Sequence, residues 1–99
     1  MEFIDIEGAS GARYRFRLLP HGCPEERMPG NYALVRRDRE RLTVLEVGEC
    51  LDLSLVRSSG AQQQAAEMFT RLNVPKAIRV AEHEDLAARH GTAGFIRAA

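Results

Sequence analysis

The sequence predicts a small α+β domain in which a mainly antiparallel sheet is flanked by helices and preceded by an additional N-terminal β-hairpin. Three observations support this fold class. Residues 12–19 alternate strictly between apolar and polar side chains, as a strand with one buried face does. Two apolar stretches, 32–35 and 42–47, are separated by a short charged turn, which is typical of a second hairpin. Residues 62–72 instead carry apolar side chains at helical spacing.

The composition is that of one ordinary globular domain, predicted to span residues 1–99 with a hairpin over 1–19 and a core over 29–99. No stretch approaches the roughly 20 apolar residues of a membrane helix, and no membrane partner is expected. Acidic residues interrupt the amino end, so we predict no signal peptide and a cytoplasmic location. The 14 basic residues balance the 14 acidic ones, so any basic surface must be local.

Residues 1–19 are predicted to form the N-terminal hairpin. Strands over 3–6 and 12–19 are joined by a tight turn at 8–11, where two glycines flank small residues. In the second strand the apolar side chains face the core and the arginines share the other face: Arg13, Arg15 and Arg17. These arginines could track phosphates. We favour a solvated face, because the neighbouring acids Glu2, Asp5 and Glu7 are placed to pair with them.

A loop over residues 20–30 connects this hairpin to the rest of the sheet. Its three prolines and two glycines prevent regular structure. His21 and Cys23 stand two apart within it, but a structural zinc ion needs four ligands and no second pair complements them. We therefore predict no metal site here and no cofactor.

The second half is predicted to alternate helices with one strand. Asp52 is expected to cap a short helix that runs through Arg57, and a second helix covers 62–72. A strand over 77–81 and a final helix over 84–96 follow. The predicted core collects apolar residues from all these elements: Tyr14, Phe16, Leu34, Val44, Leu45, Met68, Phe69, Leu72, Ile78, Val80 and Leu86.

Two tripeptides frame the central hairpin, Gly30-Asn31-Tyr32 and Glu46-Val47-Gly48. With Cys50, Asp52 and Leu53 after the second one, this arrangement resembles the GIY-YIG nuclease family. The resemblance implies the order strand, strand, helices, strand, helix, with Gly48 where the backbone turns from strand into helix. The opening from Gly8 to Phe16 is similar to bacterial proteins that place such a hairpin before a GIY-YIG domain.

The resemblance also implies a catalytic set, which this sequence matches only in part. Family members cut a phosphodiester with one divalent ion held by a glutamate on the last helix, while two tyrosines and an arginine position water and phosphate. Tyr32 matches the first tyrosine, and Glu46 stands where the second is expected. Arg57 lies one position beyond the expected arginine, and counting back from Phe95-Ile96 puts Thr92 at the metal-binding glutamate. We therefore expect a degenerate domain that has lost catalysis.

The expected function is binding, and two classes of partner stay open. One is an unidentified protein partner, for an interaction or regulatory domain. The other is nucleic acid, held by the arginines of the first hairpin and of the central turn acting together: Arg13, Arg15, Arg17, Arg36, Arg37, Arg39 and Arg41. An alternative is a weakly active nuclease that uses Mg²⁺ or Mn²⁺, with Glu46 or Glu49 as substitute ligand.

Overall fold

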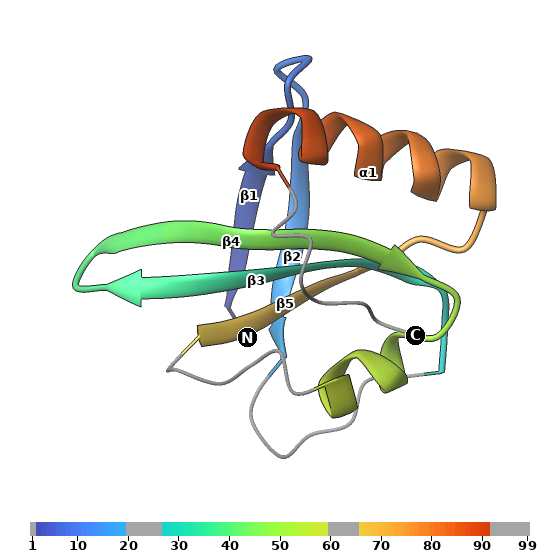
Figure 1. Cartoon of the computed structure of the whole chain (residues 1–99), viewed down its shortest axis with the longest axis horizontal. Coiled ribbons are helices and arrows are strands. Elements are labelled where there is room, and N and C mark those ends of the chain that lie inside the picture. Colours follow the sequence, from blue (N-terminus) through green and yellow to red (C-terminus); the bar gives the residue numbers. More distant parts are fainter. Residues whose placement is uncertain (1, 20–26, 60–65, 92–99) are drawn as a thin grey trace.

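The protein is a small α+β fold built on one five-stranded antiparallel sheet (Figure 1). The computed structural model describes residues 2–19, 27–59 and 66–91. In chain order the elements are β1 (Phe3–Glu7), β2 (Arg13–Leu19), β3 (Gly30–Asp38), β4 (Arg41–Cys50), the 3-10 helix η1 (Leu53–Ser59), β5 (Ala66–Leu72) and α1 (Lys76–His90). Among the described residues, no helix has the length and apolar character needed to span a membrane.

Two hairpins, β1–β2 and β3–β4, form the two sides of the sheet, and β5 lies between them. The strand order is therefore β1-β2-β5-β3-β4. The sheet is strongly twisted, so that β1 and β2 run across the direction of β3 and β4 in Figure 1. Both predicted hairpins are present. The Gly8–Gly11 turn and the β3–β4 turn project in different directions.

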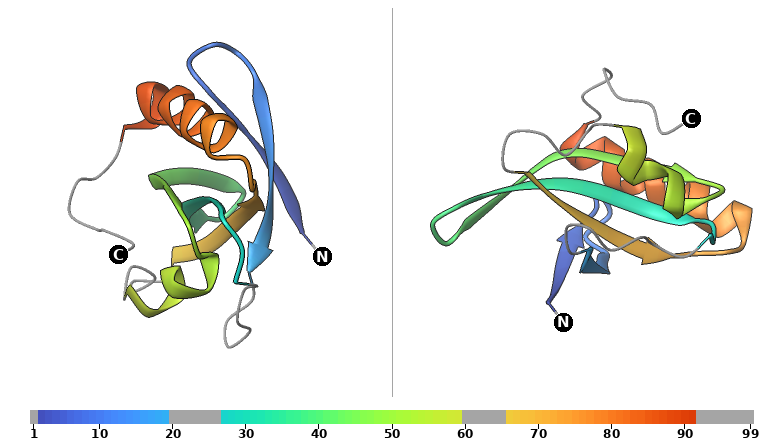
Figure 2. Two further views of the ribbon diagram at one scale, coloured as in Figure 1. Left: turned by 90° about the vertical axis from the view of Figure 1, so that its right-hand side faces the viewer. Right: turned by 90° about the horizontal axis from the view of Figure 1, so that it is seen from below.

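Each face of the sheet carries its own buried cluster, because α1 covers one face and η1 the other (Figure 2). The α1 core consists of Ile6, Phe16, Ala33, Val35, Val47, Phe69 and Leu86. The η1 core consists of Leu19, Tyr32, Leu34, Leu53, Val56, Ala66 and Met68. Alternate residues of β3 and β5 enter opposite clusters, so both strands are buried on both faces.

The predicted helix over 62–72 is wrong for its described part, since residues 66–72 form β5. Residues 62–65 lie outside the described residues. Ala66 and Met68 contact the η1 core while Phe69 contacts the α1 core. A central strand buried on both faces shows a run of apolar residues without alternation, and this run has the spacing of a helical stripe.

The predicted strand over 77–81 is also wrong, because these residues belong to α1. The helix begins after Pro75 and ends at His90, before Gly91 with its positive φ of 74°. The predicted last helix thus exists over 84–90 but starts earlier, and residues 92–96 lie outside the described part. Three predicted core residues lie outside both buried clusters: Leu72 is 43% and Ile78 51% exposed, and Val80 is half-buried and belongs to neither cluster.

The short helix after β4 is confirmed, with a 3-10 hydrogen-bond pattern. Its predicted cap is present: Asp52 Oδ1 accepts hydrogen bonds from the Ser54 amide at 3.0 Å and from the Ser54 hydroxyl at 2.6 Å. The cap satisfies an amide that has no partner within the first turn of the helix.

The helix α1 is joined to the β1–β2 turn by Asp85. Its carboxylate accepts hydrogen bonds from the amide and hydroxyl of Ser10, at 2.8 and 2.6 Å, and from the Tyr14 hydroxyl at 2.7 Å. The bonds from Ser10 and then Tyr14 hold the pKa of Asp85 below its ordinary value. This contact therefore stabilises the fold above the unfolded pKa, near pH 4, and the stabilisation is lost as pH falls through the lower folded pKa.

Candidate functional site

The side of the β1–β2 hairpin that faces away from α1 carries the predicted arginine stripe. In the left view of Figure 2 the hairpin stands at the right with α1 on its left, and no described element lies on its other side. Tyr14, Phe16 and Leu18 face α1, so the alternating arginines lie on the opposite face, as predicted. We call this surface the open arginine face; it comprises Phe3, Arg13, Arg15, Arg17, Thr70 and Leu72.

The open arginine face is continuous with the middle of the sheet through one cross-strand row. Phe3 pairs with Arg17, Arg17 with Thr70, and Thr70 with Tyr32. Exposure falls along this row, from 51% at Phe3 to 1% at Thr70 and 4% at Tyr32. The row therefore starts at an exposed aromatic edge and ends beneath η1.

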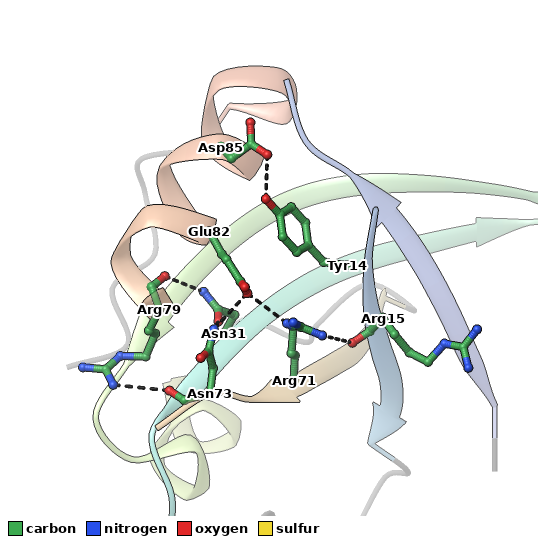
Figure 3. Close-up of polar contacts among 8 residues, drawn as sticks. All are labelled: Tyr14, Arg15, Asn31, Arg71, Asn73, Arg79, Glu82 and Asp85. Atoms are coloured by element: carbon green, nitrogen blue, oxygen red, sulfur yellow. Dashed lines mark hydrogen bonds and ion pairs between the residues drawn. The ribbon is translucent and has the colours of Figure 1, made fainter. Parts of the chain in front are cut away.

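A hollow of about 330 Å³ opens on this face. Its lining comes from three neighbouring strands: Phe3, Arg15, Arg17, Thr70, Arg71 and Leu72. The Arg15 guanidinium lies over the Phe3 ring, 5.8 Å from its centroid. Figure 3 shows the Arg15 side chain on the side of β2 away from α1 and from Tyr14. The hollow thus combines cationic, aromatic and apolar surface.

The acids beside this stripe pair with it only in part. Arg15 Nε lies 3.3 Å from Asp5 Oδ1, in an exposed ion pair whose side chains are 67% and 43% exposed. Such exposed pairs contribute little stability and exchange readily with other partners. Glu2 instead binds Arg37 at 3.0 Å, and Glu7 lies 3.9 Å from Arg89 of α1. Of the three neighbouring acids, Asp5 therefore pairs with an arginine of the stripe, while Glu2 and Glu7 bind arginines elsewhere.

The turn arginines are divided between the two faces of the sheet. Arg37 is paired with Leu42 of the α1 core and binds Glu2 and Glu67, at 3.0 and 2.9 Å. The hydrogen bonds that its guanidinium donates to Glu2 and Glu67 raise the pKa of Arg37 above the ordinary value. Arg36 points to the opposite face from Arg37, Arg39 sits in the turn with φ 62°, and Arg41 pairs with Asp38 at the start of β4. Arg37 therefore lies on the opposite face of the sheet from the stripe, whereas Arg36 pairs with Ala66 of the η1 core and lies on the same face as Arg17.

The residues at the tyrosine positions of the nuclease family are buried. Tyr32 is 4% and Glu46 2% exposed, and both lie on the face covered by η1, since Glu46 pairs with Leu34 of the η1 core. Arg57 lies within η1, and its side chain is outside the described part. Glu49, the other substitute metal ligand, binds Arg79 at 2.7 Å. Tyr32 and Glu46 therefore occupy the interior, and Glu49 supports it through Arg79.

Gly48 has a different role from the one predicted. It lies inside β4, without a positive φ, directly across from Tyr32. A Cβ at this position would overlap the Tyr32 ring and hydroxyl. The glycine therefore makes room for the tyrosine within the sheet, while the chain turns into η1 several residues later.

We expect Gly48→Ala to destabilise the domain by about 1–3 kcal/mol, because the rigid ring of Tyr32 must move away from the new methyl group. In a Tyr32→Ala background the same substitution should cost clearly less, since the ring is absent. Urea unfolding of the four proteins measures both values. An equal cost in the two backgrounds would contradict this explanation of the glycine.

A polar cluster fills the junction between α1 and the ends of β3 and β5 (Figure 3). Asn31 Nδ2 donates to the Arg79 carbonyl at 3.1 Å and Asn31 Oδ1 accepts from Asn73 at 2.9 Å. Glu82 accepts from Asn73 at 2.9 Å and from Arg71 at 3.0 Å. The donors and acceptors satisfy one another, so this cluster holds α1 against the ends of β3 and β5.

Sequence reasoning missed three members of the open arginine face: Phe3, Thr70 and Leu72. Phe3 was assigned to a strand without a role, and the two β5 residues were assigned to a helix. The signal available was the Thr and Phe content of residues 66–72, which favours a strand. Their meeting with Arg17 depends on the pairing of β2 with β5, which local patterns do not predict.

Comparison of the chain with protein-family models, with curated proteins and with solved structures finds no match. Within the described residues, no three His, Cys, Asp or Glu side chains come together as a metal site requires. Cys50 is half-buried, and this burial raises its pKa, which keeps the thiol protonated at neutral pH. His21 and Cys23 lie outside the described part.

Proposed function

We propose that this chain is a non-catalytic nucleic-acid-binding module that uses the open arginine face. The observation that supports the proposal most strongly is the hollow in which Arg15 and Arg17 meet an exposed phenylalanine. Arginine side chains hold phosphates through paired N–H donors, and an aromatic ring offers a base a surface to stack on. A solvated arginine face needs no exposed aromatic residue beside it.

The buried family positions support the non-catalytic part of the proposal. A nuclease site must admit a phosphodiester and a metal ion, whereas Tyr32 and Glu46 lie beneath η1. The last helix carries Glu82, but its carboxylate is bound by Arg71 and Asn73 on the face of the sheet opposite Tyr32.

We also propose that the chain is related to GIY-YIG domains. From β3 onward the described elements are strand, strand, one short helix, strand and helix, whereas the resemblance implies more than one helix before the third strand. The third strand and the last helix come earlier in the chain than expected.

We expect binding that is weak, independent of sequence and sensitive to salt. With about two phosphates neutralised by Arg15 and Arg17, the affinity should fall with a log–log salt slope of about −1.5 to −2. The Arg15→Ser/Arg17→Ser double variant should bind at least about tenfold more weakly and show a salt slope near zero. Fluorescence anisotropy with labelled DNA and RNA oligonucleotides, measured across salt concentration, gives both values.

Arg89→Ser is the matched control, because Arg89 is an exposed arginine on α1, away from the hollow. It should retain the affinity of the native chain within about twofold and keep its salt slope. A similar loss in both variants would indicate a general effect of net charge and would reject the open arginine face.

A second candidate, a protein-interaction surface, is favoured by a hollow of about 500 Å³ along α1. It is lined by Lys76, Ala77, Val80, Ala81 and Glu84, so its middle is apolar and its ends are charged. Absence of nucleic-acid binding at low salt would favour this surface over the open arginine face.

A further inference from the structure

We propose that the hollow beside Phe3 takes an unpaired base, so that the ligand class of the open arginine face is single-stranded nucleic acid. This inference rests on the proposed function and specifies its ligand. Phe3 would stack on the base, while Arg15 and Arg17 would bind the phosphates on either side of it.

Phe3 lies where an unpaired base can reach its ring. It begins β1, the outermost strand of the sheet, and half of its surface is exposed. One side of its ring is covered by the Arg15 guanidinium at 5.8 Å, which leaves the other side for a ligand. A base on that second side would place the ring between two partners, an arrangement that combines stacking with a cation–π contact.

The remaining lining suits a flat apolar ligand with a charged backbone. Leu72 is 43% exposed and lies on the same face of the sheet as Thr70, which pairs with Arg17. The hollow, about 330 Å³, has a volume at the lower end of the roughly 300–1,000 Å³ typical of small-ligand sites. It is therefore suited to one base and its immediate surroundings rather than to a folded partner.

A duplex cannot use this hollow in the same way. Its bases are paired and stacked inside the helix, so only its phosphates can reach the arginines. Duplex binding should depend on Arg15 and Arg17 alone, whereas single-strand binding should also depend on the aromatic ring of Phe3.

The test compares three probes at low salt: a single-stranded pyrimidine oligonucleotide, a duplex of equal length, and a single strand of equal length with abasic sites. We expect the first probe to bind at least tenfold more tightly than the other two. Phe3→Leu, which keeps an apolar side chain without a ring, should weaken binding of the first probe by roughly 5- to 100-fold. Binding of the duplex and abasic probes should change less than twofold.

Phe3→Trp supplies an independent signal, because the chain contains no other tryptophan. Its fluorescence should be quenched by the single-stranded probe and should be unchanged by the abasic one, while affinity is retained. Both variants should melt close to the temperature of the native chain, because Phe3 is half-exposed; thermal melts check this.

Two outcomes separate this inference from the proposed function. If all three probes bind equally and Phe3→Leu has no effect, the arginine surface stands and the base-stacking inference is rejected. If no probe binds even at low salt, both are rejected.

Discussion

Replacing Phe69 by Ala is expected to lower the free energy of unfolding by about 3–5 kcal/mol. Phe69 is fully buried in the middle strand of the sheet and packs in the α1 core, so its loss leaves a cavity that the surrounding strands cannot fill. A domain of this size has a total stability of about 5–15 kcal/mol, so the change should also lower the melting temperature strongly. Urea unfolding followed by circular dichroism measures the loss.

Leu72→Ala is the matched control on the same strand. Its side chain is 43% exposed, so truncation should cost no more than about 0.5 kcal/mol. A cost for Phe69→Ala as small as that of Leu72→Ala would contradict the position of β5 between the two hairpins.

Replacing Arg79 by Met is expected to cost about 2–4 kcal/mol, although methionine retains most of the side-chain volume. Arg79 is 2% exposed, binds Glu49 at 2.7 Å and donates to the carbonyl oxygens of Asn73 and Val74, at 3.3 and 2.8 Å. The variant leaves a partly buried carboxylate without its cation and removes donors from two carbonyl groups. Equilibrium unfolding in urea gives the cost.

Lys76→Met removes a positive charge from an exposed position of the same helix and should change stability by less than about 0.5 kcal/mol. Adding Glu49→Gln to the Arg79→Met variant should recover part of the loss, because the uncompensated charge is then gone. Full additivity of the two substitutions would show that the ion pair does not couple them.

Local patterns predicted the parts of the fold whose contacts are close in the chain. Strict alternation gave the arginine stripe of β2, and the charged turn gave the β3–β4 hairpin. The Asp52 cap depends only on its own helix. Alternation also places Arg15 and Arg17 on the face of β2 that points away from α1, because Phe16 and Leu18 between and beside them face α1.

The errors fall where tertiary contacts override local pattern. Ala66, Met68, Phe69 and Thr70 are buried and lie on both faces of β5, which removes the alternation that identifies a strand. Arg79 is buried although arginine is a surface residue in most proteins, because two carbonyl groups and Glu49 satisfy its guanidinium. The hollow beside Phe3 could not be predicted, since it exists only where β5 pairs with β2.

The position of β5 also affects the risk of aggregation while the chain is synthesised. Each hairpin can form soon after its residues emerge from the ribosome, but β2 and β3 then present unpaired inner edges until residues 66–72 arrive to join them. Open edges of this kind pair readily with strands of other molecules. The nascent protein is therefore most vulnerable to aggregation late in synthesis, and the strand that completes the sheet also ends the exposure of both edges.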